Sequence, residues 1–141
     1  MSEAHAVQRT ADELAIRNAL ADLAWQADSR DMDDVDAYID HFTEDAVWEM
    51  PGDVRRGRND IRAGVVERRA GVAPGVSTAH FLASTTVSFR DDDNARVRSY
   101  VQAYRVVAGD PPLLVLLARY DDQFRRTPQG WKLGRRRIEF A

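Results

Sequence analysis

The sequence predicts an α+β fold in which a curved, mostly antiparallel sheet wraps around N-terminal helices as a cone-shaped barrel. Three observations lead to this prediction. Apolar residues recur every three or four positions in the first half of the chain, the period changes to two after a loop at 71–75, and turn-forming sequences then separate four long segments rich in Val, Phe, Tyr and Thr. Such a cone has an open mouth, which suits a small-molecule pocket.

The first helix is expected to begin at Thr10 as its N-cap, with Glu13 as the capping-box partner. Residues 1–9 are expected to form a loose N-terminal arm. The helix is expected to carry one buried stripe, formed by apolar residues that recur at helical spacing: Leu14, Ile16, Leu20, Leu23, Ala24 and Ala27. With 141 residues the chain fits one domain, spanning 1–141.

Three shorter elements follow this helix. A second helix is expected over residues 33–41 because its apolar positions have helical spacing. Residues 46–50 read as a short strand that stops at the Pro-Gly pair 51–52, since proline and glycine interrupt regular structure. Helical spacing returns over residues 58–69.

The second half of the chain is expected to contain four long strands. Three turns rich in Asp, Gly and Pro separate them, at 91–94, 109–112 and 127–130. The strands themselves are expected at 77–89, 95–107, 113–126 and 131–140. Consecutive strands joined by short turns make an antiparallel meander.

Composition excludes several function classes. The chain has no cysteine, so disulfides, Cys-ligated zinc and thiol nucleophiles are excluded, and its three scattered histidines give no metal motif. No glycine-rich phosphate loop is found, and no cofactor is expected. The 23 acidic residues outnumber the 20 basic ones, which argues against nucleic-acid binding. No membrane span or secretion signal is recognised, so a cytoplasmic location is expected.

Two residues are candidates for acid–base chemistry. Asp28 lies at the margin of the buried face where the first helix ends, and His80 stands among apolar residues in a strand. A carboxylate on one ring nitrogen of a histidine fixes its tautomer and makes it a stronger base, and Asp28 is the best candidate partner for His80. The alternatives are a solvated helix-end aspartate and a structural histidine.

Arg136 is a third candidate. Strand alternation places it on the face opposite Trp131, Leu133 and Arg135. A buried arginine would offer a fixed fork of donors to a developing anion or a leaving group. The alternatives are that the arginine run 135–137 is a solvated edge or, with less support, that it binds nucleic acid.

The order of elements, together with Asp28, Trp48, His80 and the ending Gly-Trp-Lys-Leu-Gly-Arg-Arg at 130–136, resembles the SnoaL-like branch of the nuclear transport factor 2-like (NTF2-like) superfamily. The resemblance implies a cystatin-like α+β cone. The best match is to the dehydratase and dehydrochlorinase subgroup, which includes scytalone dehydratase. Those enzymes use an Asp–His dyad to remove a proton next to a leaving group.

Carried over to this chain, the resemblance implies Asp28, His80 and Arg136 as catalytic residues. It also implies that six residues line the substrate pocket: Trp48, Val101, Ala103, Leu116, Ala118 and Tyr120. The chain departs from the dehydratases near the first helix, where Leu23 and Ala27 stand in place of tyrosines that polarise a substrate carbonyl. This departure leaves the bare dyad.

The leading hypothesis is a small cofactor-free lyase or isomerase, such as a dehydratase, a dehydrohalogenase or a ketosteroid-isomerase-like enzyme, acting on a small cyclic or polycyclic apolar molecule. The alternative is a non-catalytic ligand-binding or assembly module of the same fold, such as a small subunit of a ring-hydroxylating dioxygenase. The resemblance also implies a homo-oligomer, a dimer or trimer formed through the outer sheet face. A hydrogen-bonded dyad in an enclosed pocket would separate the two hypotheses.

Overall fold

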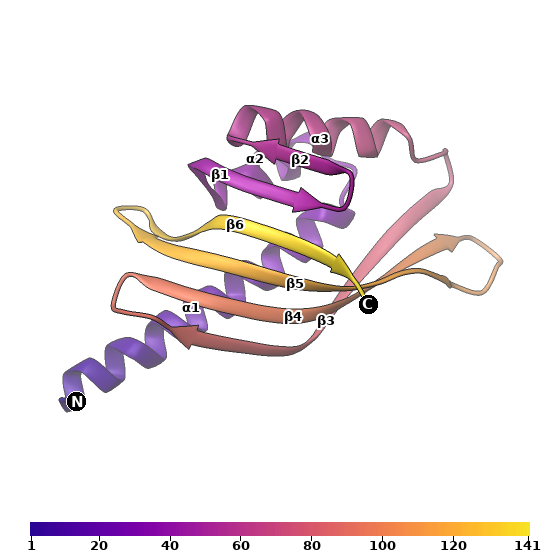
Figure 1. The fold of residues 1–141 in the computed structure, drawn as a ribbon. Coiled ribbons are helices and arrows are strands. Elements are labelled where there is room, and N and C mark those ends of the chain that lie inside the picture. The colour runs from indigo at the N-terminus through magenta and orange to yellow at the C-terminus, as the bar shows by residue number, and fades with distance from the viewer.

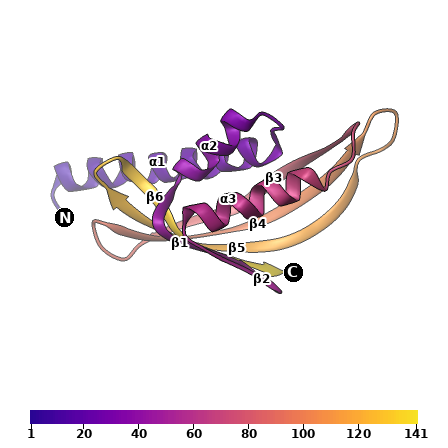
Figure 2. The same cartoon turned by 90° about the horizontal axis from the view of Figure 1, so that it is seen from above.

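Three helices pack on the concave side of a curved six-stranded sheet in the computed structural model, which describes all residues 1–141 (Figures 1 and 2). The elements run in the order α1 (Glu3–Asp28), α2 (Met32–Asp40), β1 (Phe42–Met50), β2 (Asp53–Arg56), α3 (Arg58–Ala70), β3 (Val76–Phe89), β4 (Asn94–Val107), β5 (Leu113–Thr127) and β6 (Gly130–Phe140). The predicted α+β fold is confirmed, with a sheet that curves around the helices without closing.

Helix α1 begins well before the predicted N-cap. Its N-cap is Ser2, whose hydroxyl accepts a hydrogen bond from the His5 backbone N–H at 3.1 Å. The Thr10 hydroxyl instead donates to the carbonyl of Ala6 at 3.0 Å, one turn back, as hydroxyls inside helices do. The segment 1–9, expected as a loose arm, is therefore mostly helical.

Strand β1 begins at Phe42, earlier than predicted, and the short strand β2 was not predicted from the sequence. The two strands are joined at Pro51 and Gly52, as the turn signal indicates. Gly52 has φ 85°, in the left-handed region that favours glycine. The turn lets β2 pair antiparallel with the end of β1, so that Met50 lies opposite Asp53.

The strands lie in the order β2-β1-β6-β5-β4-β3. The last four form the predicted antiparallel meander. β1 pairs with β6 in parallel, and Trp48 lies opposite Arg136 in that register. This pairing brings the first strand of the chain against the last. β2 and β3 form the two edges of the sheet, and β3 lies next to α1.

A bulge in β6 changes which side chains face the helices. Two neighbouring residues of β5 pair with Leu133 and Arg135, so Gly134 is an extra residue in the ladder. Trp131 and Leu133 are buried before the bulge, and Arg136 is buried after it. The prediction that Arg136 lies on the opposite face from Trp131 and Leu133 was therefore wrong, because the bulge resets strand alternation.

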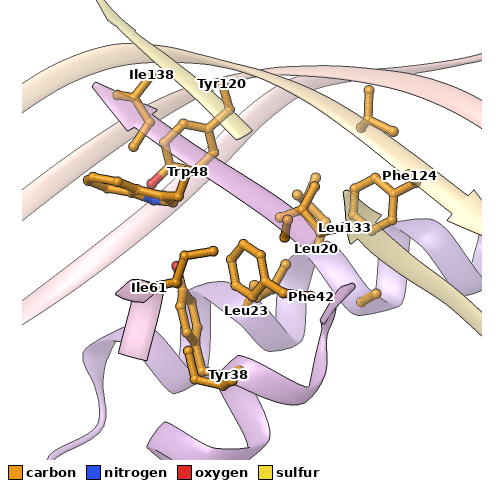
Figure 3. Close-up of a cluster of buried hydrophobic side chains, with 14 of the residues drawn as sticks. Leu20, Leu23, Tyr38, Phe42, Trp48, Ile61, Tyr120, Phe124, Leu133 and Ile138 are labelled. Atoms are coloured by element: carbon orange, nitrogen blue, oxygen red, sulfur yellow. The ribbon is translucent and has the colours of Figure 1, made fainter. Parts of the chain in front are cut away.

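One hydrophobic core fills the space between the helices and the concave face. It contains 21 buried residues, and Figure 3 shows Leu20 and Leu23 of α1 gathered with Phe42, Phe124 and Leu133. Burying a side chain of this size stabilises the fold by about 1.5–3 kcal/mol. The core thus anchors α1 and β1 against the sheet. None of the helices combines the length and the apolar character needed to cross a bilayer.

Candidate active site

A cavity of about 410 Å³ opens among the C-terminal ends of α1 and α3, helix α2 and the concave face of the sheet. This volume suits a compact ring compound. The apolar wall includes Trp48, Met50, Val65, Leu116 and Ile138. The polar and charged lining includes Asp28, Arg30, Tyr38, Arg68, Arg69, Thr78, His80 and Tyr120.

Asp28 and His80 form a hydrogen-bonded pair on the surface of this cavity. Asp28 is the last residue of α1, and His80 lies in β3, which runs beside α1. The ring Nδ1 of His80 is 2.5 Å from Asp28 Oδ1. The His80 backbone N–H donates to Asp28 Oδ2 at 2.8 Å, and the Thr78 hydroxyl donates to Oδ1 at 3.0 Å. These contacts from β3 hold the carboxylate in one orientation.

The second ring nitrogen of His80, Nε2, has no hydrogen-bond partner in the protein. When Nδ1 donates to the carboxylate, the neutral ring leaves Nε2 as an acceptor. The His80 side chain is 22% exposed and the Asp28 side chain 18% exposed, and both residues line the cavity. They also line a groove of about 420 Å³ between α1 and β3, together with Trp25 and Phe81. An acceptor nitrogen that a bound molecule can reach is suited to proton removal.

Two tyrosines contribute hydroxyl groups to the cavity. Tyr38 comes from α2 and Tyr120 from β5, and neither hydroxyl donates to another protein group. Figure 3 shows both hydroxyls pointing toward the side of the cluster where Trp48 lies. Burial raises the pKa of Tyr120 to about 12, so its phenol keeps its proton and is a hydrogen-bond donor at neutral pH. The cavity therefore holds a base and two neutral donors.

Arg136 is buried behind the cavity wall instead of lining it. Its guanidinium forms a two-pronged pair with Asp122, with both N–O distances 2.9 Å, and lies 4.0 Å from the Tyr120 ring centroid. Burial alone would lower the pKa of Arg136, but Asp122 raises it above its usual value; burial raises the pKa of Asp122, and Arg136 opposes that shift. Each carboxylate oxygen of Asp122 accepts a hydrogen bond from the guanidinium, and this arrangement favours the ionised form of the pair.

The expected pocket wall divides into two groups. Trp48, Leu116 and Tyr120 line the cavity. The other three expected wall residues are buried in the sheet and do not line it: Val101, Ala103 and Ala118. Their small side chains lie on the concave face of β4 and β5, where Ala103 pairs with His80 across the ladder.

Sequence reasoning missed several cavity residues. Tyr38 lies in the predicted helix over residues 33–41, where it was not considered as a site residue, and its hydroxyl was the available signal for a site role. Arg68 and Arg69 end α3, where basic residues are ordinary because they face the negative helix end. No group of three or more His, Asp or Glu side chains converges in a way that could hold a metal ion.

The chain is similar to a known domain family in sequence and to several solved structures in fold. The model of the SnoaL-like domain matches residues 8–137 of the chain. No match was found among curated protein sequences.

Solved structures from Novosphingobium aromaticivorans resemble nearly the whole chain. A candidate aromatic ring hydroxylase is 30% identical, with a TM-score of 0.80 over 94% of this chain and 90% of its own. An NTF2-like protein with a cystatin-like fold is 28% identical, with a TM-score of 0.84 over 98% of this chain and 87% of its own. A candidate scytalone dehydratase is 21% identical, with a TM-score of 0.81 over 96% of this chain and 88% of its own, and it shows the shared fold alone.

Proposed function

The chain belongs to the SnoaL-like domain family, and from this premise we propose that it is a small cofactor-free lyase or isomerase acting on a cyclic or polycyclic apolar molecule. The observation that carries this proposal is the Asp28–His80 pair, with a free Nε2, on the surface of a largely apolar cavity.

In the proposed reaction His80 is the general base. Its Nε2 takes a proton from a carbon of the bound molecule, and the electron pair of that C–H bond forms a new double bond. In a lyase the electrons then expel a leaving group, such as hydroxide or halide, from the adjacent carbon. In an isomerase they move toward a carbonyl, and the proton returns at another carbon. Asp28 stabilises the imidazolium that forms in either case.

Tyr38 and Tyr120 are proposed to donate hydrogen bonds to negative charge that develops on an oxygen of the substrate. These hydroxyls would polarise a substrate carbonyl. The sequence did not predict such donors, because Leu23 and Ala27 stand where the dehydratases have tyrosines. Donors fixed in a water-poor site each contribute roughly 10²–10³ in rate. Arg136 is proposed to act indirectly, by holding the ring of Tyr120 from behind.

Replacing His80 by alanine tests the proposal. Ligands would first be found by a thermal-shift screen of polycyclic ketones, alcohols and halides, and turnover would then be followed by loss of the leaving group or by exchange of a substrate C–H for deuterium. We expect His80→Ala to lower kcat by about 10³-fold or more with the melting temperature nearly unchanged. His5→Ala, which removes a remote histidine paired with Asp92, should retain full activity. Turnover that survives in His80→Ala would refute the assignment.

A second candidate function is an assembly module without catalysis of its own. The observation that favours it is the 30% identity to a candidate aromatic ring hydroxylase. This reading requires a larger catalytic subunit that co-purifies with the chain and stays active when His80 is replaced. Turnover by the isolated chain would decide against it.

The proposed partners are a small hydrophobic molecule and further copies of the chain. We propose a homo-oligomer, a dimer or trimer, and a cytoplasmic location. The homo-oligomer is proposed because the outer sheet face exposes apolar side chains, which include Phe81, Tyr100 and Leu117.

A further inference from the structure

The mouth of the cavity is basic, although the chain as a whole has a net charge of −3. Three arginines, Arg30, Arg68 and Arg69, line it against one carboxylate, Asp28. That carboxylate is already engaged by three donors from β3. The arginine charges are thus not neutralised by any acid of the cavity.

Arg69 has a structural task. Its guanidinium donates to the backbone carbonyls of Gln26 and Asp31 at 2.5 and 3.1 Å, which ties the end of α3 to the end of α1 beside Asp28. Arg30 makes only a single 3.3 Å hydrogen bond, to the carbonyl of Ala73. The cations available to a ligand are therefore Arg68 and Arg30.

Arg68 is placed over the cavity wall without any polar partner. Its guanidinium carbon lies 4.5 Å from the centre of the Trp48 ring, and it takes part in no hydrogen bond or ion pair with the protein. Elsewhere on the same helix, Arg62 pairs with Asp36 at 3.1 Å. The cation–π contact holds the Arg68 guanidinium at the cavity while leaving all its N–H groups free.

We propose that the substrate is a ring compound bearing a carboxylate, and that Arg68, assisted by Arg30, binds this group at the mouth while the rings lie between Trp48 and His80. This inference rests on the proposed function for the identity of the site and adds the class of its substrate. A guanidinium with free N–H groups matches a carboxylate in geometry and charge. The acidic group would also orient the rings, so that a fixed carbon faces Nε2 of His80.

Calorimetric binding of two matched probes tests the inference without any turnover. The probes are naphthaleneacetate and naphthaleneethanol of the same substitution pattern, which differ only in the charged group. At low salt we expect the wild-type protein to bind the acid about five- to tenfold more tightly than the alcohol, and the preference to shrink as salt is added. Arg68→Gln should reduce the preference to about twofold or less, because the acid loses more affinity than the alcohol.

The matched control is Arg62→Gln, which removes the same charge from the same helix away from the cavity and should keep the preference. If Arg62→Gln and Arg68→Gln reduce the preference for the acid equally, the preference comes from the overall positive charge of the helix and not from a contact with Arg68. This result would overturn the proposal. So would a preference that survives in Arg68→Gln, or binding of neither probe to the wild-type protein. His80→Asn, which lacks the base, should retain the preference. A wild-type protein that selects the acid but turns over no substrate would contradict the proposed function and leave this inference standing.

Discussion

At the residue scale, Asp28 and His80 have a possible chemical role only because of the contacts that β3 supplies. An aspartate at a helix end is ordinarily solvated, yet Asp28 accepts from the backbone N–H of His80 and the hydroxyl of Thr78 as well as facing the imidazole. These contacts fix the carboxylate independently of the ring. The fixed carboxylate in turn orients the His80 ring and keeps it in one tautomer, as a general base requires.

Asp28→Asn isolates this orienting role. An asparagine amide can present its NH₂ group to Nδ1, which favours the tautomer in which Nε2 carries the proton and cannot act as a base. We expect kcat to fall by about 10³–10⁴-fold with ligand affinity nearly unchanged. Thr78→Val, which removes one donor to Asp28, should cost about tenfold or less. If Asp28→Asn keeps kcat within a few-fold of the wild-type value, Asp28 does not orient the base.

The Asp122–Arg136 pair is a structural element in this fold, and its two residues depend on each other. Both side chains are almost fully buried, at 0% and 4% exposure. Arg136→Met should lower the free energy of unfolding by about 3–5 kcal/mol because it leaves Asp122 buried without a partner. Asp122→Leu combined with Arg136→Met should recover most of that loss in urea titrations. A double variant no more stable than Arg136→Met would contradict this account.

Sequence reasoning at this scale could predict that two residues meet where the pairing follows from their types and from the helix and strand that carry them. Asp28 and His80 were selected in this way, and the structure places them in hydrogen-bonding distance. Arg136 was assigned to the wrong face because the bulge at Gly134 has no signal in the apolar pattern. Tyr38 was missed because a tyrosine on the buried face of a short helix reads as core, whichever way its hydroxyl points.

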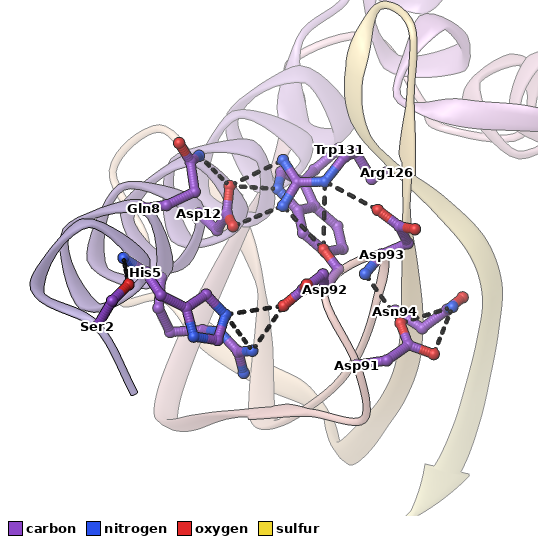
Figure 4. A network of polar contacts seen from close by, with 11 residues as sticks. Ser2, His5, Gln8, Asp12, Asp91, Asp92, Asp93, Asn94, Arg126 and Trp131 are labelled. Carbon is purple, nitrogen blue, oxygen red and sulfur yellow. Dashed lines mark hydrogen bonds and ion pairs between the residues drawn. The ribbon is translucent and has the colours of Figure 1, made fainter.

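At the element scale, the first turns of α1 are fastened by polar contacts and not by an apolar stripe. Asp12 accepts hydrogen bonds from Arg126 at 2.6 and 3.0 Å, from the Trp131 indole at 3.1 Å and from Gln8 at 3.0 Å (Figure 4). Val7, in contrast, is 65% exposed. The helix is thereby joined to the β5–β6 turn region, which explains why the apolar period did not reveal its start.

This fastening predicts how stability depends on acid. Burial alone would raise the pKa of Asp12, but the hydrogen bonds from Arg126, Trp131 and Gln8 outweigh it and lower the pKa from 3.8 to about 2. Because the folded value lies below the unfolded one, the carboxylate contributes full stability at neutral pH. That contribution is lost as the pH falls through 3.8 toward about 2.

Asp12→Asn should therefore lower the free energy of unfolding at neutral pH by about 2 kcal/mol and make the acid dependence in this window shallower. Urea titrations at neutral pH and at about pH 3 measure both effects. Asp22→Asn is the matched control, since Asp22 is an exposed aspartate of the same helix with no hydrogen-bond partner, and it should change neither. An unchanged acid dependence in Asp12→Asn would show that the network does not stabilise the fold.

The strands of the meander could be predicted because each is long and its turns carry strong local signals. β2 has only four residues, and its pairing with β1 depends on a tight turn instead of a pattern of its own. The parallel pairing of β1 with β6 joins segments far apart in the sequence. No local period reports such a contact, so the position of Trp48 opposite Arg136 had to come from the structure.

At the scale of the whole molecule, the sheet has one covered face and one open face. The helices cover the concave face, and the outer face of β3, β4 and β5 exposes apolar side chains. Phe81 is 59% exposed, Tyr100 47% and Leu117 46%. Phe81 pairs with Gln102 and Gln102 pairs with Leu117, so these side chains lie on the same face across three strands. Exposed apolar side chains grouped in this way are typical of a surface that binds another protein chain.

We expect this face to join copies of the chain, so light scattering after size-exclusion chromatography should give a multiple of the 15.9 kDa protomer mass. Leu117→Glu should shift the protein toward monomers with its helical and sheet content intact, whereas Val7→Glu, at an exposed apolar position away from the sheet, should not. A wild-type monomer would refute the expectation.

Association through this face would also affect the site, because Phe81 lines the groove that reaches His80 between α1 and β3. A second copy that covers Phe81 would close this outer approach and leave the cavity beside Trp48 as the way to Nε2. Monomeric Leu117→Glu should then show a faster solvent exchange of the His80 ring, observed by NMR, than the wild-type oligomer. Equal exchange in the two would mean that the groove stays open and that association through the outer face does not shield the base.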